Sequence, residues 1–201
     1  MSAALPLPTR ARSRVGPTPV PTKPLYLVAL LLPEPALAEV WALKQEVHQR
    51  TGSRNAVRLP PHITLIPPLR QSPEFEQKAR QTLAAFAVTQ QPFGVGVQDF
   101  AWFGNRTLFV RVPEDEGVRA FHAALQAWCA AQLPEVPRET RPFTPHVTLA
   151  TRDLPAGQVP ELRSLFAART YAATFEVATF QLFRHDGQQW QVVQAFALTA
   201  A

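Results

Sequence analysis

A five-residue sequence occurs twice in this chain and constrains the fold more than any other feature. The two copies, Pro61-His62-Ile63-Thr64-Leu65 and Pro145-His146-Val147-Thr148-Leu149, differ in one residue. In each copy His and Thr alternate with aliphatic residues, which is the pattern of a strand with one buried face. Because residues i and i+2 of a strand share a face, each copy presents one imidazole and one hydroxyl on the side opposite its aliphatic residues.

Two such strands that meet across a cleft would place two titratable rings and two hydroxyl donors in one site. One imidazole can remove a proton and the other can supply one, since imidazole has a pKa of about 6.5. The hydroxyls can donate hydrogen bonds to the non-bridging oxygens of a phosphate. The site therefore suits a phosphodiester, with His62 and His146 as catalytic residues and Thr64 and Thr148 as phosphate-binding residues. The sequence leaves open which His is the base.

At these residues the chain resembles the 2H phosphoesterases, which carry two H-x-T/S-x motifs about half a chain apart. It is most similar to the bacterial branch known as 2'-5' RNA ligase or RNA 2',3'-cyclic phosphodiesterase, over Leu25 to about Leu198. The resemblance implies hydrolysis of a 2',3'-cyclic phosphate, at an RNA end or on a nucleotide, to a 2'-phosphate. The resemblance also implies reversible 2'-5' RNA ligation. A His pair acting as acid and base requires no metal ion and no cofactor.

Three residues beside the second motif are further candidates for substrate binding. Arg141 and Arg152 carry guanidinium groups, which are good phosphate ligands. Phe143 can stack a base, as aromatic side chains do in readers of single-stranded RNA. The chain departs from the family at Arg152, because close relatives often carry Arg directly after the Thr-Leu-Ala run, where this chain has Thr151. His122 and His185 are not assigned to the site.

Three other functions are compatible with parts of the pattern. The fold could bind a nucleotide or an RNA end without turnover. An enzyme would lose its turnover when one His is substituted, whereas a binding module would show no turnover at all. His62 and His146 could be metal ligands, although no carboxylate or Cys accompanies them at a ligand spacing such as H-E-x-x-H. Serine hydrolysis lacks support because no G-x-S-x-G is present.

Charge is concentrated at the start of the chain. Of the net charge of +5, Arg10, Arg12, Arg14 and Lys23 contribute four charges within the first 24 residues, which contain no acid. The remaining body is nearly neutral, so its charge does not argue for a long polyanionic partner. Residues 1–24 show no hydrophobic period and are predicted to be a disordered tail. Residues 25–201 are predicted to form one two-lobed domain.

Cysteine content and hydropathy indicate the compartment. Cys129 is the single cysteine, so no intrachain disulfide can form and a reducing compartment is expected. No apolar run approaches the roughly eighteen residues of a membrane span. We therefore expect a cytoplasmic monomer whose partner is its substrate, with no membrane association.

The predicted fold class is α+β, with two similar lobes on either side of a central cleft. Each lobe is expected to be a small, mainly antiparallel sheet flanked by helices, with one motif strand facing the cleft. Asp186-Gly187 predicts a hairpin turn. The predicted strands are 25–32, 61–66, 93–101, 106–112, the second motif, 173–184 and 189–199, and the predicted helices are 35–50, 73–88, 115–133 and 159–168.

Overall fold

A computed structural model describes residues 23–113 and 116–200 of the chain. The predicted disordered tail, residues 1–24, lies outside these ranges except for its last two residues. The Pro24 carbonyl accepts a hydrogen bond of 3.1 Å from the Gln71 amide. The first described residues are therefore hydrogen-bonded to the segment that follows the first motif strand.

The order strand, helix, motif strand, helix occurs twice along the chain, and three strands follow the second copy. Its elements are β1 (Leu25–Leu31), α1 (Ala36–Thr51), η1 (Asn55–Val57), β2 (His62–Arg70), α2 (Pro73–Ala87), β3 (Phe93–Phe103), β4 (Thr107–Arg111), α3 (Glu116–Gln132), β5 (His146–Ala150), η2 (Ala156–Gln158), α4 (Val159–Ala167), β6 (Ala172–Val177), β7 (Thr179–His185) and β8 (Trp190–Ala197).

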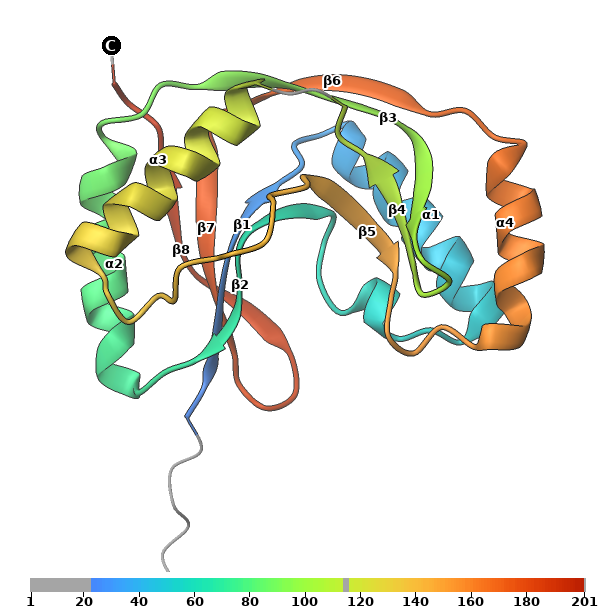
Figure 1. The fold of residues 1–201 in the computed structure, drawn as a ribbon, viewed down its shortest axis with the longest axis horizontal. Coiled ribbons are helices and arrows are strands. Elements are labelled where there is room, and N and C mark those ends of the chain that lie inside the picture. Colours follow the sequence, from blue (N-terminus) through green and yellow to red (C-terminus); the bar gives the residue numbers. More distant parts are fainter. Residues whose placement is uncertain (1–22, 114–115, 201) are drawn as a thin grey trace, which may run out of the picture.

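The described strands form one antiparallel sheet in the order β6-β3-β4-β5-β2-β1-β7-β8. The α+β prediction is confirmed, and the two predicted lobes correspond to two four-stranded halves of this sheet. The halves meet at the two motif strands, where β2 and β5 pair at Ile63 and Val147. Helices α2 and α3 lie at one end of the molecule, and α1 and α4 lie at the other (Figure 1). Each half of the sheet therefore contributes one motif strand to the centre.

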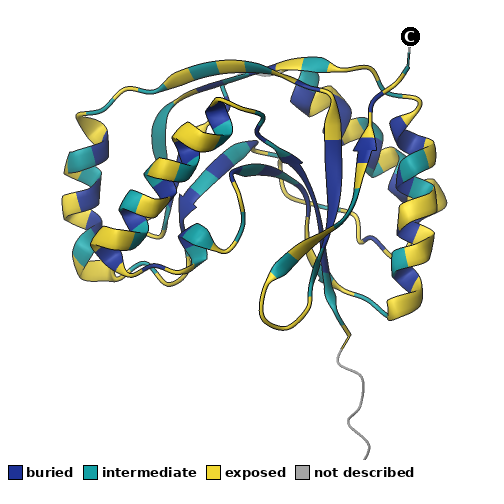
Figure 2. Ribbon diagram, turned by 180° about the vertical axis from the view of Figure 1, so that it is seen from behind, coloured by how far each residue is buried: buried dark blue, intermediate teal, exposed yellow. Residues whose placement is uncertain are grey.

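One face of the sheet packs into a core that includes residues of all four helices. Ile63 and Leu65 of β2 and Val147 and Leu149 of β5 belong to this core and are at most 2% exposed. Buried residues line the inner sides of the helices and alternate with more exposed residues along the motif strands (Figure 2). The period of two in the motifs therefore turns His62, Thr64, His146 and Thr148 to the opposite face, away from this core.

Strand β1 is buried on both faces, which explains its continuous run of apolar residues. Tyr26, Val28 and Leu30 belong to the main core. Leu27 and Ala29 belong to a second, smaller apolar cluster on the other face, together with Phe183, Leu31, Leu59 and Trp190. This smaller cluster supports the sheet face that carries the motif histidines.

Two predicted strands differ from the structure. The predicted strand 173–184 is wrong as a single element, because the chain leaves the sheet at Ala178: β6 pairs with β3 at one edge, whereas β7 pairs with β1 in the other half. The first motif strand continues past residue 66 to Arg70, through Pro67 and Pro68. These prolines are tolerated because this part of β2 pairs only with β1, where the ladder is irregular and Leu27 is skipped. The hairpin at Asp186-Gly187 is confirmed.

Candidate active site

The pairing of β2 with β5 brings the four motif side chains together. Since Ile63 is opposite Val147 in an antiparallel pair, His62 lies opposite Thr148, and Thr64 lies opposite His146. The two histidines therefore occupy one diagonal of a four-residue group and the two threonines the other. Diagonal neighbours on adjacent strands are about 7–8 Å apart, which leaves long side chains within reach of a common ligand.

Both histidine rings are held in the same way by the backbone. The Nδ1 of His62 lies 2.6 Å from the Pro60 carbonyl oxygen, and the Nδ1 of His146 lies 2.8 Å from the Thr144 carbonyl oxygen. A carbonyl only accepts hydrogen bonds, so each Nδ1 must carry the proton and donate it. In the neutral ring Nε2 is then the atom with the free lone pair. Each copy of the motif thus fixes its own imidazole in the tautomer that a general base at Nε2 requires.

Both rings resist protonation, and His62 does so more strongly. Burial lowers the pKa of His62 to about 4, with further lowering by the charges of Lys44 and His146, and the hydrogen bond to Pro60 opposes this shift. Burial also lowers the pKa of His146, against the effect of its bond to Thr144. Lys44 contributes to the pKa shift of His62 and not to that of His146, so the two rings are not equivalent.

The threonine hydroxyls are available to a ligand. Thr64 and Thr148 are half-buried, and in the described part of the chain no side-chain or backbone group bonds to either hydroxyl. A hydroxyl that faces a cleft without an internal partner can donate to an oxygen of a bound molecule. The same pairing that gathers the imidazoles therefore supplies two free donors beside them.

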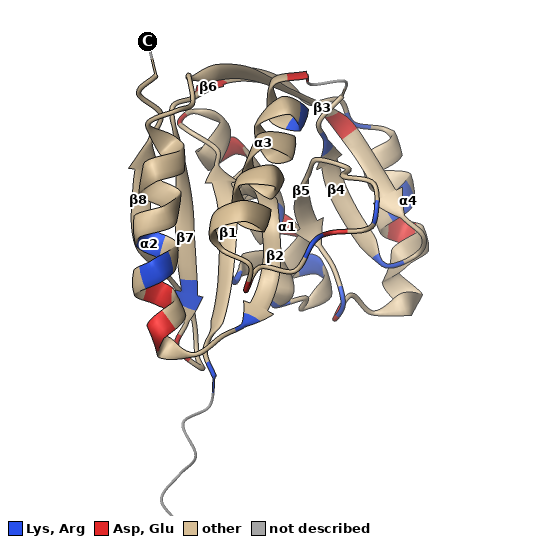
Figure 3. Ribbon diagram, turned by 60° about the vertical axis from the view of Figure 1, so that its left-hand side comes forward, with Lys and Arg blue, Asp and Glu red and all other residues tan. Residues whose placement is uncertain are grey.

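The four motif side chains line a cleft of about 860 Å³. Among the described residues, the basic ones lining the cleft are Lys44, Arg58, Arg141 and Arg152, and the one acidic residue is Glu139, which pairs with Arg141. Elsewhere acidic and basic residues are interspersed, for example along α2 and α4 (Figure 3). The excess of positive charge is therefore local to the cleft and favours an anionic ligand.

Aromatic rings flank His146. The Phe103 ring stacks on Phe109 at 4.2 Å between centroids. The His146 ring lies edge-to-face with both, at centroid distances of 4.9 Å from Phe103 and 5.2 Å from Phe109. Phe109 is 6% exposed, whereas Phe103 is 41% exposed. Phe109 therefore confines the imidazole, and Phe103 leaves a large apolar surface at the cleft for a ligand.

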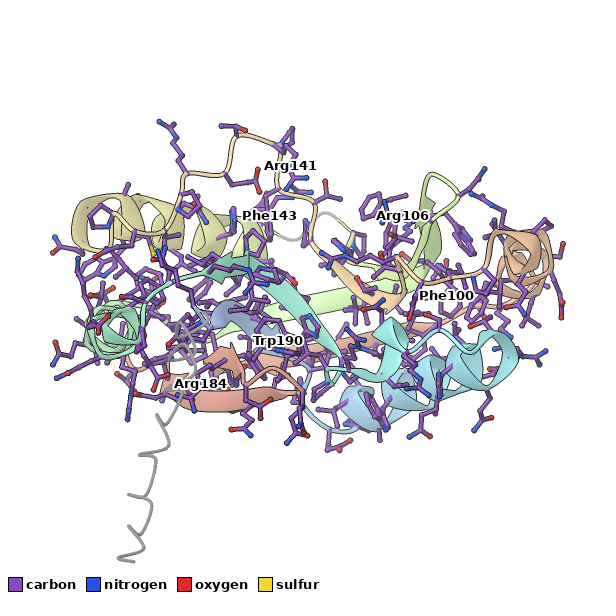
Figure 4. All side chains as sticks on the ribbon, turned by 90° about the horizontal axis from the view of Figure 1, so that it is seen from below. Phe100, Arg106, Arg141, Phe143, Arg184 and Trp190 are labelled. Atoms are coloured by element: carbon purple, nitrogen blue, oxygen red, sulfur yellow. The ribbon has the colours of Figure 1, made fainter. Side chains whose placement is uncertain are left out.

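The three further candidates for substrate binding, Arg141, Phe143 and Arg152, all line the cleft, and each is held by different contacts. Arg141 and Phe143 come from the segment that leads into β5, while Trp190 of β8 lines another part of the cleft (Figure 4). Arg141 makes two side-chain bonds to Glu139, each 3.1 Å. Phe143 stacks on the ring of His122 at 3.7 Å and 4°, so one of its faces is already covered.

Arg152 lies at the cleft in a tight turn. Its φ is 57°, in the left-handed region that few residues other than glycine adopt. The next residue, Asp153, donates its N–H to the Thr151 carbonyl at 2.7 Å, and its carboxylate accepts bonds from the Ser53 hydroxyl and the Arg54 amide, at 2.6 and 2.9 Å. This turn keeps Arg152 at the cleft.

Two histidines and one lysine that line the cleft were not assigned to the site from the sequence. His122 and His185 were not assigned to the site, yet both line the cleft. His122 is 9% exposed and bonds to the Leu65 backbone. Lys44 lies with the buried residues Val40 and Val47 on one side of α1, and it also lines the cleft. A cation on an apolar helix face was the one signal that indicated it.

The sequence model for the 2'-5' RNA ligase superfamily matches residues 32–189. The chain belongs to this superfamily. The match covers both motifs and confirms the resemblance to the 2H phosphoesterases. No helix in the described ranges is long and apolar enough to cross a membrane, and no group of three or more His, Cys, Asp or Glu residues in these ranges could hold a metal ion.

Relatives in the superfamily extend over most of the chain. A protein of Geobacillus kaustophilus that carries the name of a candidate phosphoesterase is 26% identical over 141 residues, which are 69% of this chain and 78% of its own. The crystal structure of TT0787 from Thermus thermophilus has a TM-score of 0.64 and 24% identity over 88% of this chain and 98% of its own. Escherichia coli LigT, crystallised with 3'-AMP, has a TM-score of 0.60 and 19% identity over 88% and 99%. These two structures establish the shared fold.

Proposed function

We infer that this protein hydrolyses a 2',3'-cyclic phosphate, at an RNA end or on a nucleotide, to a 2'-phosphate. The observation that carries the inference is the matched tautomer of the two motif histidines, each fixed by a carbonyl two residues before it. Two imidazoles at one cleft, with two free hydroxyls between them, are the groups that an in-line attack on phosphorus requires. Membership of the superfamily and the phosphoesterase name of a relative support the reaction class.

The reaction needs a proton to move on each side of phosphorus. One neutral imidazole takes a proton from water at Nε2 as the water oxygen bonds to phosphorus. The bond from phosphorus to one ribose oxygen breaks, and the protonated imidazole gives that oxygen its Nε2 proton. Thr64 and Thr148 donate to the non-bridging oxygens, where negative charge increases in the transition state. If the 5'-hydroxyl of a second RNA attacked phosphorus in place of water, the same groups would join a 2' end to a 5' end.

The cleft lining supports a nucleotide as the substrate. The basic residues of the cleft favour a phosphate, and the exposed ring of Phe103 beside His146 offers a stacking surface for a base. Neither a metal ion nor a cofactor enters the scheme. The active form is one domain acting on one nucleotide end, without membrane association.

The test is a panel of phosphodiesters offered to the purified protein. Four 2',3'-cyclic nucleotides, a short RNA with a 2',3'-cyclic phosphate end and a 3',5'-cyclic nucleotide would be incubated with wild type, and the products separated by chromatography against 2'- and 3'-phosphate standards. We expect turnover of the 2',3'-cyclic compounds to 2'-phosphates. Binding without turnover of any compound would instead identify a nucleotide-binding module.

A further inference from the structure

A row of four residues crosses the sheet at the far end of the cleft from the motif residues. Arg70 of β2 pairs with Leu25 of β1, Leu25 also pairs with His185 of β7, and His185 pairs with Trp190 of β8. Residues directly opposite each other on antiparallel strands point to the same face of the sheet. Leu25, His185 and Trp190 line the cleft, so Arg70 points to the cleft side as well. These four residues are called the distal row below.

The distal row is separated from the motif residues by most of the length of β1. Leu31 pairs with His62, and Leu25, six residues earlier in β1, pairs with Arg70. Six residues of a strand span roughly 20 Å. The start of β1, the end of β2 and the β7–β8 turn lie together at one edge of the molecule (Figure 1). A ligand that fills the cleft from the motif to the distal row is therefore longer than one nucleotide.

The His185 ring is held in the opposite tautomer to the motif histidines. The backbone N–H of Gly187 donates a hydrogen bond of 3.1 Å to its Nδ1. Because Nδ1 accepts this bond, the neutral ring carries its proton at Nε2. The rings of His62 and His146 instead donate from Nδ1. His185 is therefore suited to donate from Nε2 to an oxygen of a ligand, and not to remove a proton there.

Two cationic side chains lie beside the row. A second hollow of about 570 Å³ adjoins the cleft at Leu25 and His185, which line both, and its wall includes Lys23 and Arg70. The Nη1 of Arg70 donates to the Lys23 carbonyl at 3.2 Å. No carboxylate of residues 23–113 or 116–200 forms an ion pair with Arg70 or Lys23.

The acidic groups of the second hollow bind other partners. Among its described residues these are Glu76 and Asp186. The Glu76 carboxylate pairs with Arg184 at 2.9 Å. The Asp186 carboxylate accepts the backbone N–H groups of Gln188 and Gln189, each at 2.8 Å. The positive charge of Lys23 and Arg70 therefore favours an anion from outside the chain.

Trp190 adds an aromatic surface to the row. Its ring centre lies 5.1 Å from that of His185, with the two planes at 75°. It packs on the smaller apolar cluster around Leu27 and Phe183 and is half-buried. In Figure 4 it lies apart from Arg141 and Phe143, which line another part of the cleft. An indole held in this way can stack a nucleic-acid base of any identity.

We propose that the distal row is a second contact site for single-stranded RNA, which binds nucleotides on the 5' side of the cyclic phosphate. Arg70, Lys23 and the Nε2–H of His185 bind a backbone phosphate, and Trp190 stacks a base. This inference rests on the proposed hydrolysis, which places the terminal phosphate at the motif residues. It specifies that a short RNA, and not a free nucleotide, occupies the whole cleft.

The first test measures binding without turnover. RNAs of one to six nucleotides that end in a 3'-phosphate would be titrated into the full chain by calorimetry at several salt concentrations. Affinity should rise with length and level off once the strand reaches the distal row. Arg70→Gln should make the slope of log affinity against log salt shallower by about 0.7 for the longest RNA, the effect of one lost phosphate contact on a single strand.

The aromatic contact and the control are tested in the same titrations. Trp190→Leu should weaken binding of the longest RNA by about fivefold or more, the usual effect of losing one base stack, and leave the mononucleotide unchanged. Trp190→Phe keeps a ring and should lose less. Arg80→Gln removes an exposed arginine of α2 that bonds to Gln194 outside the cleft, and should change no affinity.

The second test compares kcat and KM for 2',3'-cyclic AMP and for a six-nucleotide RNA with a 2',3'-cyclic phosphate end. Arg70→Gln should raise KM for the RNA and leave both constants for the mononucleotide unchanged. Affinity that does not rise beyond one nucleotide, or a salt slope that Arg70→Gln leaves unchanged, would overturn the proposal. Length-dependent binding that needs the distal row, without turnover of any compound, would refute the proposed hydrolysis alone.

Discussion

Replacing Lys44 with methionine should make the protein more stable at neutral pH. Met fills a similar volume without a charge. A lysine whose pKa falls from its ordinary 10.5 to about 7 on folding costs about 5 kcal/mol at pH 7, at roughly 1.36 kcal/mol per pKa unit. The Nζ of Lys44 donates a hydrogen bond of 2.8 Å to the Leu59 carbonyl, and leaving this carbonyl unpaired returns about 1–3 kcal/mol of the cost. We therefore expect Lys44→Met to raise the free energy of unfolding by about 2–4 kcal/mol.

The extra stability of Lys44→Met over wild type should decrease as the pH rises above 7. Between about pH 7 and 10.5 the unfolded chain holds a proton on Lys44 that the folded chain has lost, so the stability of the wild type rises with pH in this window. By pH 10 the charge penalty has nearly disappeared, and the unpaired carbonyl should make Lys44→Met equal to or less stable than wild type. Below pH 7 the gain should be constant.

Urea unfolding of wild type, Lys44→Met and Lys78→Met at pH 7 and pH 10 measures both effects. Lys78→Met should differ little from wild type, because its ion pair is exposed. A Lys44→Met protein that is less stable than wild type at pH 7, or whose advantage is the same at both pH values, would refute the reasoning. A variant that is more stable but less active would indicate that the buried charge is retained for function.

Three further predictions concern the cleft. Because the active form needs one neutral and one protonated ring, and the pKa values of both rings are lowered, kcat/KM should be bell-shaped with its maximum between about pH 4 and 6.5. A maximum above pH 8 would contradict this. Thr64→Val and Thr148→Val should each lower kcat by up to about 10² to 10³ with little change in melting temperature, and unchanged kcat in both would remove the threonines from the transition state. Phe103→Ala should raise KM for a cyclic nucleotide more than it lowers kcat, whereas a selective loss of kcat would show that the ring acts through His146.

The motif strands were predictable because their information is local. A period of two over five residues sets which side chains face the core, and the repeat identifies the pair that must meet. The bounds of the helices differ from the prediction by at most one residue. The register of Ile63 with Val147 was not in the sequence pattern, since it depends on how the two halves of the sheet join.

The missed residues reach the cleft from helices or hairpins whose place is set by tertiary packing. Lys44 lies on α1 and His122 on α3, and neither helix carries a motif. Both side chains nevertheless line the cleft beside the motif strands. The break at Ala178 was missed because neither glycine nor proline marks it, and apolar alternation continues on both sides. Only the pairing of β6 and β7 with different halves of the sheet reveals it.

The central claim is that His62 and His146 act as a metal-independent acid and base pair. The most direct measurement is the steady-state rate of 2',3'-cyclic AMP hydrolysis by wild type, His62→Ala, His146→Ala and the double variant, each with and without a chelator. We predict that each single variant loses about 10² to 10⁴ in rate, that the double variant loses less than the product of the two, and that the chelator has no effect. Full activity in either single variant, or activity that the chelator abolishes and one divalent metal restores, would contradict the account.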